Sequence, residues 1–207
     1  MFNKDILMLD IESTGIDVTK HEIIQIAGII LDKKALHEKK SFTSYVRPTN
    51  WKGRSAEAMA VNNIGWDELK NAPSLKTVLQ QFNKTFGRNV IPATYGGNLD
   101  IVFLPAAYRS AGMKYPFEYH TFNMWPLCYT YMAQRKQLKN KKRFVGFSLE
   151  DIGDYLGVKR MPGRHDALGD CLYQAAVLRA LLKAVKSLPG KAKTSKATKR
   201  AAKKRRA

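Results

Sequence analysis

An apolar run near the N-terminus turns acidic and then ends in small residues: Ile6-Leu7-Met8-Leu9-Asp10-Ile11-Glu12-Ser13-Thr14-Gly15. The apolar residues predict a buried strand, and the small residues predict the turn that ends it. Asp10 and Glu12 stand two positions apart, so their side chains point to the same face of the strand. Two converging carboxylates suit a hard cation such as Mg²⁺ or Mn²⁺, and a solvated strand end is the alternative.

Two further strands follow at short intervals. Ile23–Leu31 is rich in β-branched residues and bounded by charge, which predicts a central strand. Lys40–Arg47 alternates apolar and polar residues until Pro48 stops it. Three successive strands with short connections predict an antiparallel meander.

The rest of the chain predicts mainly helices, apart from a short strand at Val90–Tyr95. Ser74 and Ser148 are expected helix caps, and Gly157 is an expected helix stop. The sequence therefore predicts a mixed α/β domain with its first strands ahead of most helices. The helices are expected at residues 56–61, 66–70, 74–86, 101–111, 123–135, 148–156 and 168–182.

Another acidic residue, Asp100, follows a predicted strand and the turn Tyr95-Gly96-Gly97-Asn98. At the start of a helix, an Asp is commonly a cap. The junction between strand and helix also allows Asp100 to face the same site as Asp10.

The last helix carries a clear apolar stripe, and Asp170 lies off that stripe near its buried end. On an ideal helix His165 and Asp170 would diverge by about 140°. They converge only if His165 lies in the loop that Pro162-Gly163 begins. A fixed carboxylate with a mobile imidazole suits a metal-assisted hydrolase, and a capping His with a solvated Asp is the alternative. The stripe consists of Leu168, Cys171, Leu172, Ala175, Leu178 and Leu182.

The charge balance indicates a polyanionic partner. The 207 residues include 36 Lys and Arg against 17 Asp and Glu, a formal net charge of +19. Eleven of those bases and no acid lie from Lys183 to Ala207, which leaves +8 for Met1–Leu182. Nucleic acid is the first candidate partner, and an anionic membrane surface is the second. The basic stretch Lys136–Arg143 is expected to be a solvated loop, with phosphate contact as the alternative.

The composition also excludes several classes of protein. With 44% hydrophobic and 10% aromatic residues, the body is not intrinsically disordered. No apolar run is long enough for a membrane span, and no secretory signal is seen. Cys128 and Cys171 form no Cys-x-x-Cys pair, which argues against structural zinc and against a secreted disulfide scaffold. We expect an intracellular, reducing location: cytoplasmic or nucleoid-associated, or nuclear in a eukaryotic host.

Three segments together resemble the motifs of the DEDDh 3′–5′ exonucleases, the DnaQ-like superfamily of the epsilon proofreading subunit, ribonuclease T and oligoribonuclease. Leu9–Gly15 resembles the first motif, D-x-E-[ST]-T-G, and Gly97–Leu104 resembles the second, H-N-x-x-F-D-x-x-F-L. His165–Asp170 matches the third, H-x-A-x-x-D. The intervening segment Arg47–Pro73 is similar to the proofreading branch. A single motif is weak, but three in series over Asp5–Leu182 are specific.

This resemblance implies a ribonuclease H-like, mixed five-stranded sheet flanked by helices. It implies a metal-dependent 3′–5′ exonuclease that releases 5′-nucleotides from single-stranded DNA or a frayed 3′ end, with His165 as the general base. Two divalent ions, Mg²⁺ or Mn²⁺, are expected on the carboxylates of Asp10, Glu12, Asp100 and Asp170. Contacts with the terminal nucleotide are expected from Ser13, Thr14, Gly15, Ile16, Asn63 and Asn98.

The sequence departs from the family's pattern at two positions, and both are expected to affect substrate contacts more than metal ligands. The second motif is one residue short and lacks its His and Phe. Asn62-Asn63-Ile64-Gly65 stands where the family usually has His-Gly-Ile-Thr. RNA trimming therefore stays open as the alternative substrate choice. A catalytically weak nucleic-acid-binding module is the alternative from a different class, and the intact catalytic positions argue against it.

We expect an exonuclease domain at residues 1–188 and a disordered, basic tail at residues 189–207 that binds nucleic acid. A targeting signal is the alternative for the tail. No polymerase domain is recognised in the sequence, so proofreading would need a polymerase partner in trans. A homodimer is left open, and no membrane partner is expected.

Overall fold

The computed structural model describes residues 2–96, 98–135, 147–160 and 166–187. In this part of the chain, strands form a mixed five-stranded sheet in the order β3-β2-β1-β4-β5. The first three strands pair antiparallel, whereas β4 and β5 run parallel to β1. The predicted meander and mixed sheet are thus confirmed. The strands are β1 (Asp5–Ser13), β2 (Ile23–Leu31), β3 (Glu38–Tyr45), β4 (Val90–Thr94) and β5 (Phe122–Asn123).

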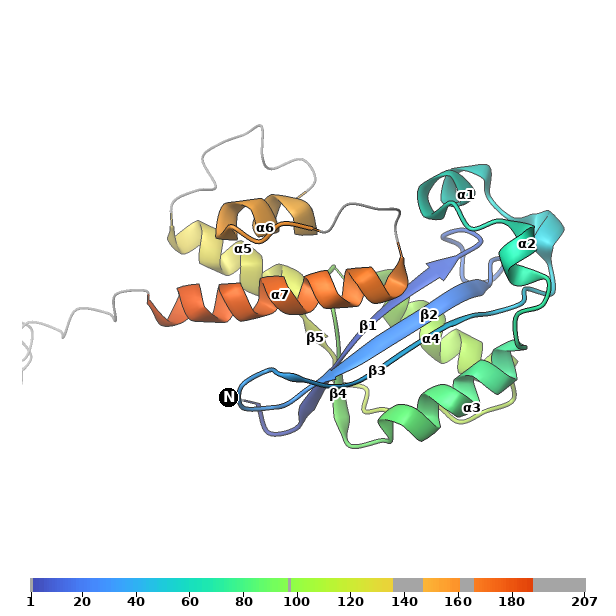
Figure 1. The fold of residues 1–207 in the computed structure, drawn as a ribbon, viewed down its shortest axis with the longest axis horizontal. Coiled ribbons are helices and arrows are strands. Elements are labelled where there is room, and N and C mark those ends of the chain that lie inside the picture. The colour runs from blue at the N-terminus through green and yellow to red at the C-terminus, as the bar shows by residue number, and fades with distance from the viewer. Residues whose placement is uncertain (1, 97, 136–146, 161–165, 188–207) are drawn as a thin grey trace, which may run out of the picture.

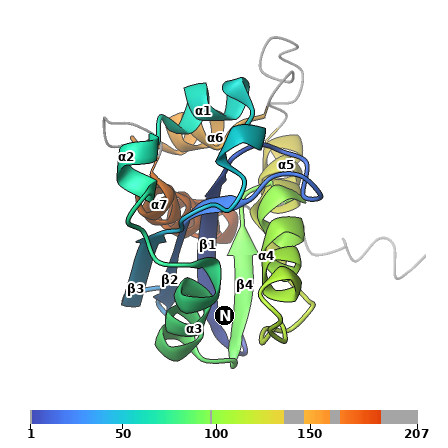
Figure 2. The same ribbon diagram turned by 90° about the vertical axis from the view of Figure 1, so that its right-hand side faces the viewer.

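Helices cover both faces of the sheet (Figure 1). They are α1 (Ala56–Asn62), α2 (Trp66–Leu69), α3 (Leu75–Phe86), α4 (Asn98–Ser110), α5 (Met124–Gln134), α6 (Leu149–Leu156) and α7 (Ala167–Lys186). Figure 2 shows α7 on one side of the strands and α3 and α4 on the other. The short helices α1 and α2 lie beyond one end of the sheet.

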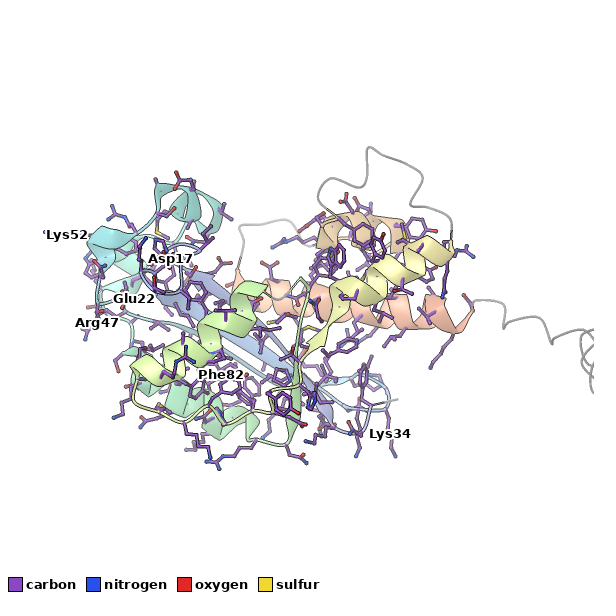
Figure 3. The ribbon with its side chains drawn as sticks, turned by 180° about the vertical axis from the view of Figure 1, so that it is seen from behind. Asp17, Glu22, Lys34, Arg47, Lys52 and Phe82 are labelled. Carbon is purple, nitrogen blue, oxygen red and sulfur yellow. The ribbon has the colours of Figure 1, made fainter. Side chains whose placement is uncertain are left out.

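The alternation of side chains along β1 explains this layering. Ile6 and Met8 point into the core that α5, α6 and α7 complete. Leu7 and Leu9 point the other way, into the core beneath α3 and α4. Phe82, on α3, is fully buried in that second core, and Figure 3 shows it from behind. A residue's place in the strand therefore decides which core it joins.

Several helix ends are confirmed where the sequence predicts them. The Ser74 hydroxyl accepts from the N–H of Thr77 at the start of α3. Ser148 and Asp151 cap α6 reciprocally through side-chain and backbone bonds. Gly157 ends α6 in the left-handed conformation that glycine adopts readily.

The strand β1 includes the acidic residues, as the sequence predicts, and it ends at Ser13, the first residue of the predicted turn. Asp10 pairs with Ala27 and Glu12 pairs with Gln25, so the strand continues to Ser13. The long apolar strand β2 offers partners along this whole length, and it keeps the acidic segment extended.

The apolar stripe predicted for α7 is wrong in one position and incomplete. Leu172 is 44% exposed, whereas Tyr173, Gln174, Val177 and Leu181 are buried. The helix packs on the sheet and also against α5 and α6, so its buried face is wider than one stripe and is turned away from Leu172.

One expected boundary also shifts, and one strand lies outside the ranges predicted from the sequence. The helix α4 begins at Asn98, so Asp100 lies in its first turn rather than ahead of it. The two-residue strand β5, not expected from the sequence, precedes α5 at Phe122–Asn123. Within the described residues, no helix is long and apolar enough to cross a membrane.

Candidate active site

The strand β1 carries its acidic residues to the face on which α7 packs. Asp10 and Glu12 have the same parity as Ile6 and Met8, so they continue that face beyond the apolar core. Asp170, in the first turn of α7, is only 8% exposed and meets them there. One carboxylate oxygen from each of the three residues lies within 4.8 Å of the others.

Asp100 approaches the same site from α4. Its Oδ1 accepts a hydrogen bond of 3.2 Å from the backbone N–H of Ile11. The pairing of β4 with β1 ends at Met8, so the Ile11 N–H is beyond the reach of that strand. A side chain at the N-terminus of the following helix takes the place of the missing strand partner.

The acidic cluster is electrostatically strained without a cation. Burial, followed by repulsion from Asp100 and Asp170, raises the pKa of Asp10 well above its usual range. Burial, and then repulsion from Asp170 and Asp100, raises the pKa of Glu12 to about 7. Burial also raises the pKa of Asp100 to about 6, against the opposing effect of the Ile11 hydrogen bond. Each of these carboxylates therefore lies where its charged form is disfavoured, and a nearby cation would favour that form.

Two buried glutamines hold the acidic residues in place. The Gln174 amide donates to Asp10 Oδ1 at 3.0 Å, and its carbonyl oxygen accepts from the Tyr95 N–H at 3.0 Å. The Gln25 amide donates to Asp166 Oδ1 at 2.8 Å, and its carbonyl oxygen accepts from the Ala167 N–H at 3.1 Å. The first joins β1 to β4 and α7, and the second attaches the start of α7 to β2.

A positive charge also reaches the cluster. Arg160, in the segment after α6, pairs through Nη2 with Asp170 Oδ1 and through Nη1 with Glu150 Oε1 at 2.8 Å. Its side chain is 22% exposed. Its charge opposes the upward shift of the pKa of Asp10 and of Glu12.

The expected substrate residues border the acidic cluster on the side of the β1–β2 turn. Thr14 is buried, and its hydroxyl accepts from the Glu22 N–H at 2.9 Å. The Ser13 hydroxyl donates to the Gly15 carbonyl at 2.6 Å. A Cβ on Gly15 would lie 2.5 Å from the His21 ring, so the turn has room only for glycine there. Figure 3 shows Asp17 and Glu22 in this region.

Ile16, at the tip of the turn, is 75% exposed. Asn63 is exposed at the end of α1 in the left-handed conformation, while its neighbour Asn62 is buried and donates to the Ser13 carbonyl at 3.1 Å. Ile16 and Asn63 therefore present side chains to solvent, and Asn62 supports the turn from behind.

Some predicted features fall outside the described residues. They are His165, Gly97, the loop at 136–143 and the tail at 189–207; Asn98 is described only as the first residue of α4. The described residue next to His165 is Asp166, the N-cap of α7, which accepts from the Gly169 N–H at 3.1 Å.

Gln25, Gln174 and Arg160 were not singled out from the sequence. A signal for Gln25 was present, because a polar residue inside the apolar run Ile23–Leu31 needs a buried partner. Nothing in the local pattern points to Gln174 or Arg160, since their partners are set by the packing of α7.

Comparisons with known proteins agree with this arrangement. The exonuclease family model RNase_T matches residues 7–178. The DNA polymerase III PolC-type of Listeria innocua is 26% identical over 109 residues, which are 52% of this chain and 7% of that protein. The chain thus corresponds to a small part of that curated relative.

Solved structures share the fold at low sequence identity. E. coli Exonuclease I in complex with a dT13 oligonucleotide is 14% identical with a TM-score of 0.73, covering 90% of this chain and 42% of that chain. The nuclease domain of 3'hExo, a DEDDh family member bound to rAMP, is 20% identical with a TM-score of 0.61, covering 87% of this chain and 92% of that chain.

The sheet and the acidic cluster at the end of its β1 strand define the class of protein: a hydrolytic nuclease with a ribonuclease H-like fold. More particularly, the chain belongs to the RNase_T exonuclease family, of the DEDDh type, as its three motifs predict.

Proposed function

We propose that this protein is a 3′–5′ exonuclease that removes 5′-nucleotides from single-stranded DNA or from a frayed 3′ end. The observation that carries the proposal is the convergence of Asp10, Glu12 and Asp170 in a partly buried site. A substrate phosphate is itself an anion, so four carboxylates would repel it unless cations intervene. The acidic site therefore makes chemical sense as a metal-dependent phosphodiesterase site.

The donor set fits hard divalent cations such as Mg²⁺ or Mn²⁺, which prefer carboxylate oxygens. We propose that Asp10, Glu12, Asp170 and Asp100 would together hold a pair of such ions. When bound, such a pair of ions stabilises the attacking and leaving oxygens of an in-line displacement. The raised pKa values of Asp10, Glu12 and Asp100 support this assignment, because burial and then mutual repulsion disfavour the charged carboxylates, and a bound cation would favour them again.

The remaining roles fall to side chains around the cluster. His165 would accept the proton of the attacking water as the general base. It stands directly before Asp166, which Gln25 binds at the start of α7. Ser13, Thr14 and Gly15 would face the terminal sugar, and the exposed Ile16 would pack on the last base. Asn63 and Asn98 would complete the contacts with the terminal nucleotide.

Trimming of RNA is the second candidate function. The similarity to a DNA polymerase III sequence favours DNA, and so does the likeness of Arg47–Pro73 to the proofreading branch. In favour of RNA, a solved 3'-exonuclease described with histone mRNA stem-loop recognition shares this fold, with 20% identity and a TM-score of 0.64, over 87% of this chain and 64% of that chain.

One experiment separates these functions. The full chain and its Asp10→Ala variant are incubated with 3′-labelled single-stranded DNA, duplex DNA and RNA, each with Mg²⁺ and with chelator. We expect the parent to release labelled mononucleotide from single-stranded DNA fastest, only with Mg²⁺. The variant should bind the strand and release nothing. Degradation by both proteins alike would refute the metal-dependent exonuclease, and faster release from RNA would assign the second function.

A further inference from the structure

Arg160 is a charged residue at the site that the catalytic motifs do not account for. Its guanidinium lies between the metal-ligand candidate Asp170 and the α6 residue Glu150, with one nitrogen directed to each carboxylate. The guanidinium also lies 6.0 Å from the centre of the Tyr173 ring. Arg160 is therefore a fixed, largely covered cation at the edge of an acidic site, rather than a solvated surface charge.

The two ion pairs of Arg160 differ in whether their carboxylate belongs to the acidic cluster. The side chain of Glu150 is 47% exposed and lies outside the acidic cluster, so this pair leaves the cluster unchanged. The side chain of Asp170 is 11% exposed and belongs to the cluster, so the second pair engages a carboxylate that a divalent cation would also bind. A guanidinium and a metal ion are thus competing positive partners for the Asp170 carboxylate.

The charge of Arg160 extends beyond Asp170. It favours the ionised forms of Asp10 and Glu12, which their burial and their neighbours disfavour. A positive charge in this place stabilises the acidic site when no cation is bound. The same charge repels an incoming cation and weakens its binding.

We propose that Arg160 is an internal counter-ion of the acidic site, which competes with divalent cations for Asp170 and so sets the cation concentration at which the enzyme becomes loaded. When cations bind, Asp170 turns its oxygen to them and Arg160 keeps its bond to Glu150. The ion pair with Glu150 then keeps the guanidinium of Arg160 away from the cation-bound carboxylates. This inference rests on the proposed function, because it takes the cluster to be a metal site.

The test measures metal binding and thermal unfolding on the full-length chain, without any assay of nuclease activity. Titration with Mn²⁺ by calorimetry gives the Kd, and Tm is recorded in chelator and in saturating Mg²⁺. We expect Arg160→Gln to bind Mn²⁺ about tenfold more tightly, within the usual range of coupling between sites. Its Tm should fall in chelator and should recover most of the loss in Mg²⁺.

A second variant makes the opposite prediction. Glu150→Gln keeps the positive charge and removes the anchor outside the cluster, so Arg160 should pair more strongly with Asp170 and Mn²⁺ should bind more weakly than in the parent. Because Glu150 is half-exposed, this variant should fold even if Arg160→Gln does not.

Arg179→Gln is the matched control. Arg179 is another arginine with a defined partner, and it lies on the packed helix α7, where its Nε donates to the Leu36 carbonyl at 2.8 Å, away from the acidic cluster. Its Tm should fall equally in chelator and in Mg²⁺, with the Kd unchanged. The inference is overturned if Arg160→Gln behaves like this control, or if Glu150→Gln binds Mn²⁺ as tightly as the parent or more tightly. Failure of the parent to bind Mn²⁺ at all would instead refute the proposed function.

Discussion

At the scale of single residues, the site is a set of carboxylates whose charged forms are disfavoured when no cation is bound. Burial and mutual repulsion raise the pKa of Glu12 to about 7 and that of Asp100 to about 6. In the unfolded chain both groups return to ordinary values near 4. At these two carboxylates, the folded, metal-free protein therefore binds more protons than the unfolded chain between about pH 4 and pH 7.

This difference predicts how stability depends on pH. The contribution of Glu12 is fully present below its unfolded pKa and is lost as the pH rises through about 7. In chelator, the Tm of the parent should therefore fall from pH 5 to pH 7.5 more steeply than that of Glu12→Gln, by on the order of 5 °C. The exposed Glu38→Gln on β3 is the control and should keep the parent's slope. Equal slopes for the parent and Glu12→Gln would contradict the assignment.

His165 allows a separate prediction, because a general base acts on turnover and not on metal binding. We expect His165→Ala to lower kcat by about 10²–10⁴-fold, with the Kd for Mn²⁺ within twofold of the parent's. Single-turnover kinetics on 3′-labelled DNA and Mn²⁺ calorimetry measure the two quantities. A kcat within a few-fold of the parent's would remove His165 from the mechanism.

At the scale of elements, the decisive contact is the attachment of α7 to β2. The Gln25 side chain makes two hydrogen bonds to the first residues of α7, one turn before Asp170. Gln25 is 4% exposed and Ala167 is fully buried, so no water can readily replace Gln25 as the acceptor for the Ala167 N–H. The orientation of a metal-ligand candidate thus depends on a residue from a different strand.

Gln25→Ala should affect both stability and activity. Loss of the two bonds leaves the buried Ala167 N–H without its acceptor, at a cost of about 1–3 kcal/mol. Release of the α7 N-terminus should also lower kcat well below the parent's at temperatures where the variant stays folded. Denaturant unfolding and the 3′-end assay check these effects.

Ser74→Ala is the matched control at this scale. It removes the cap of α3, on the far side of the sheet, and should cost about 1 kcal/mol. Its kcat should equal the parent's. If Gln25→Ala lowers stability and leaves kcat at the parent's value, the attachment is structural only.

At the scale of the whole molecule, the charge is divided between an acidic site and a basic remainder. The net charge of +19 and the eleven bases from Lys183 to Ala207 suit a phosphate backbone, while the site itself is acidic. We propose that the domain at 1–188 carries the reaction and that the tail at 189–207 holds the strand without reading its sequence.

Removal of Lys191–Ala207 tests that division. The shortened chain should bind single-stranded DNA more weakly at 150 mM salt, and the slope of log Kd against log salt should become shallower. Its kcat at saturating substrate should be unchanged. Fluorescence anisotropy over a salt series gives the slope, and an unchanged slope would exclude phosphate contact by the tail.

Much of the fold could be predicted from local pattern. The meander, the caps Ser74 and Ser148 and the stop Gly157 depend on residues close in sequence, and the structure confirms them. The prediction is wrong where the packing of neighbouring elements decides burial. Leu172 is an example: the apolar stripe places it on the buried face of α7, but it is 44% exposed. The helical spacing of apolar residues predicts one narrow buried face. The buried face of α7 is wider, because the helix contacts the sheet and also α5 and α6.

The sequence by itself determined which residues could do chemistry here. The two-residue spacing of Asp10 and Glu12 makes them share a face in any strand, and the three motifs mark the remaining candidates. Only the tertiary structure decided what surrounds them, through bonds such as Gln174 to Asp10 and Gln25 to Asp166, whose partners are 164 and 141 residues apart. Local spacing sets the direction of a side chain over a few residues, whereas the meeting of distant side chains depends on how the helix packs on the sheet. The pairing of Arg160 with Asp170 joins residues that are much closer in sequence, and it accompanies the packing of α6 against α7.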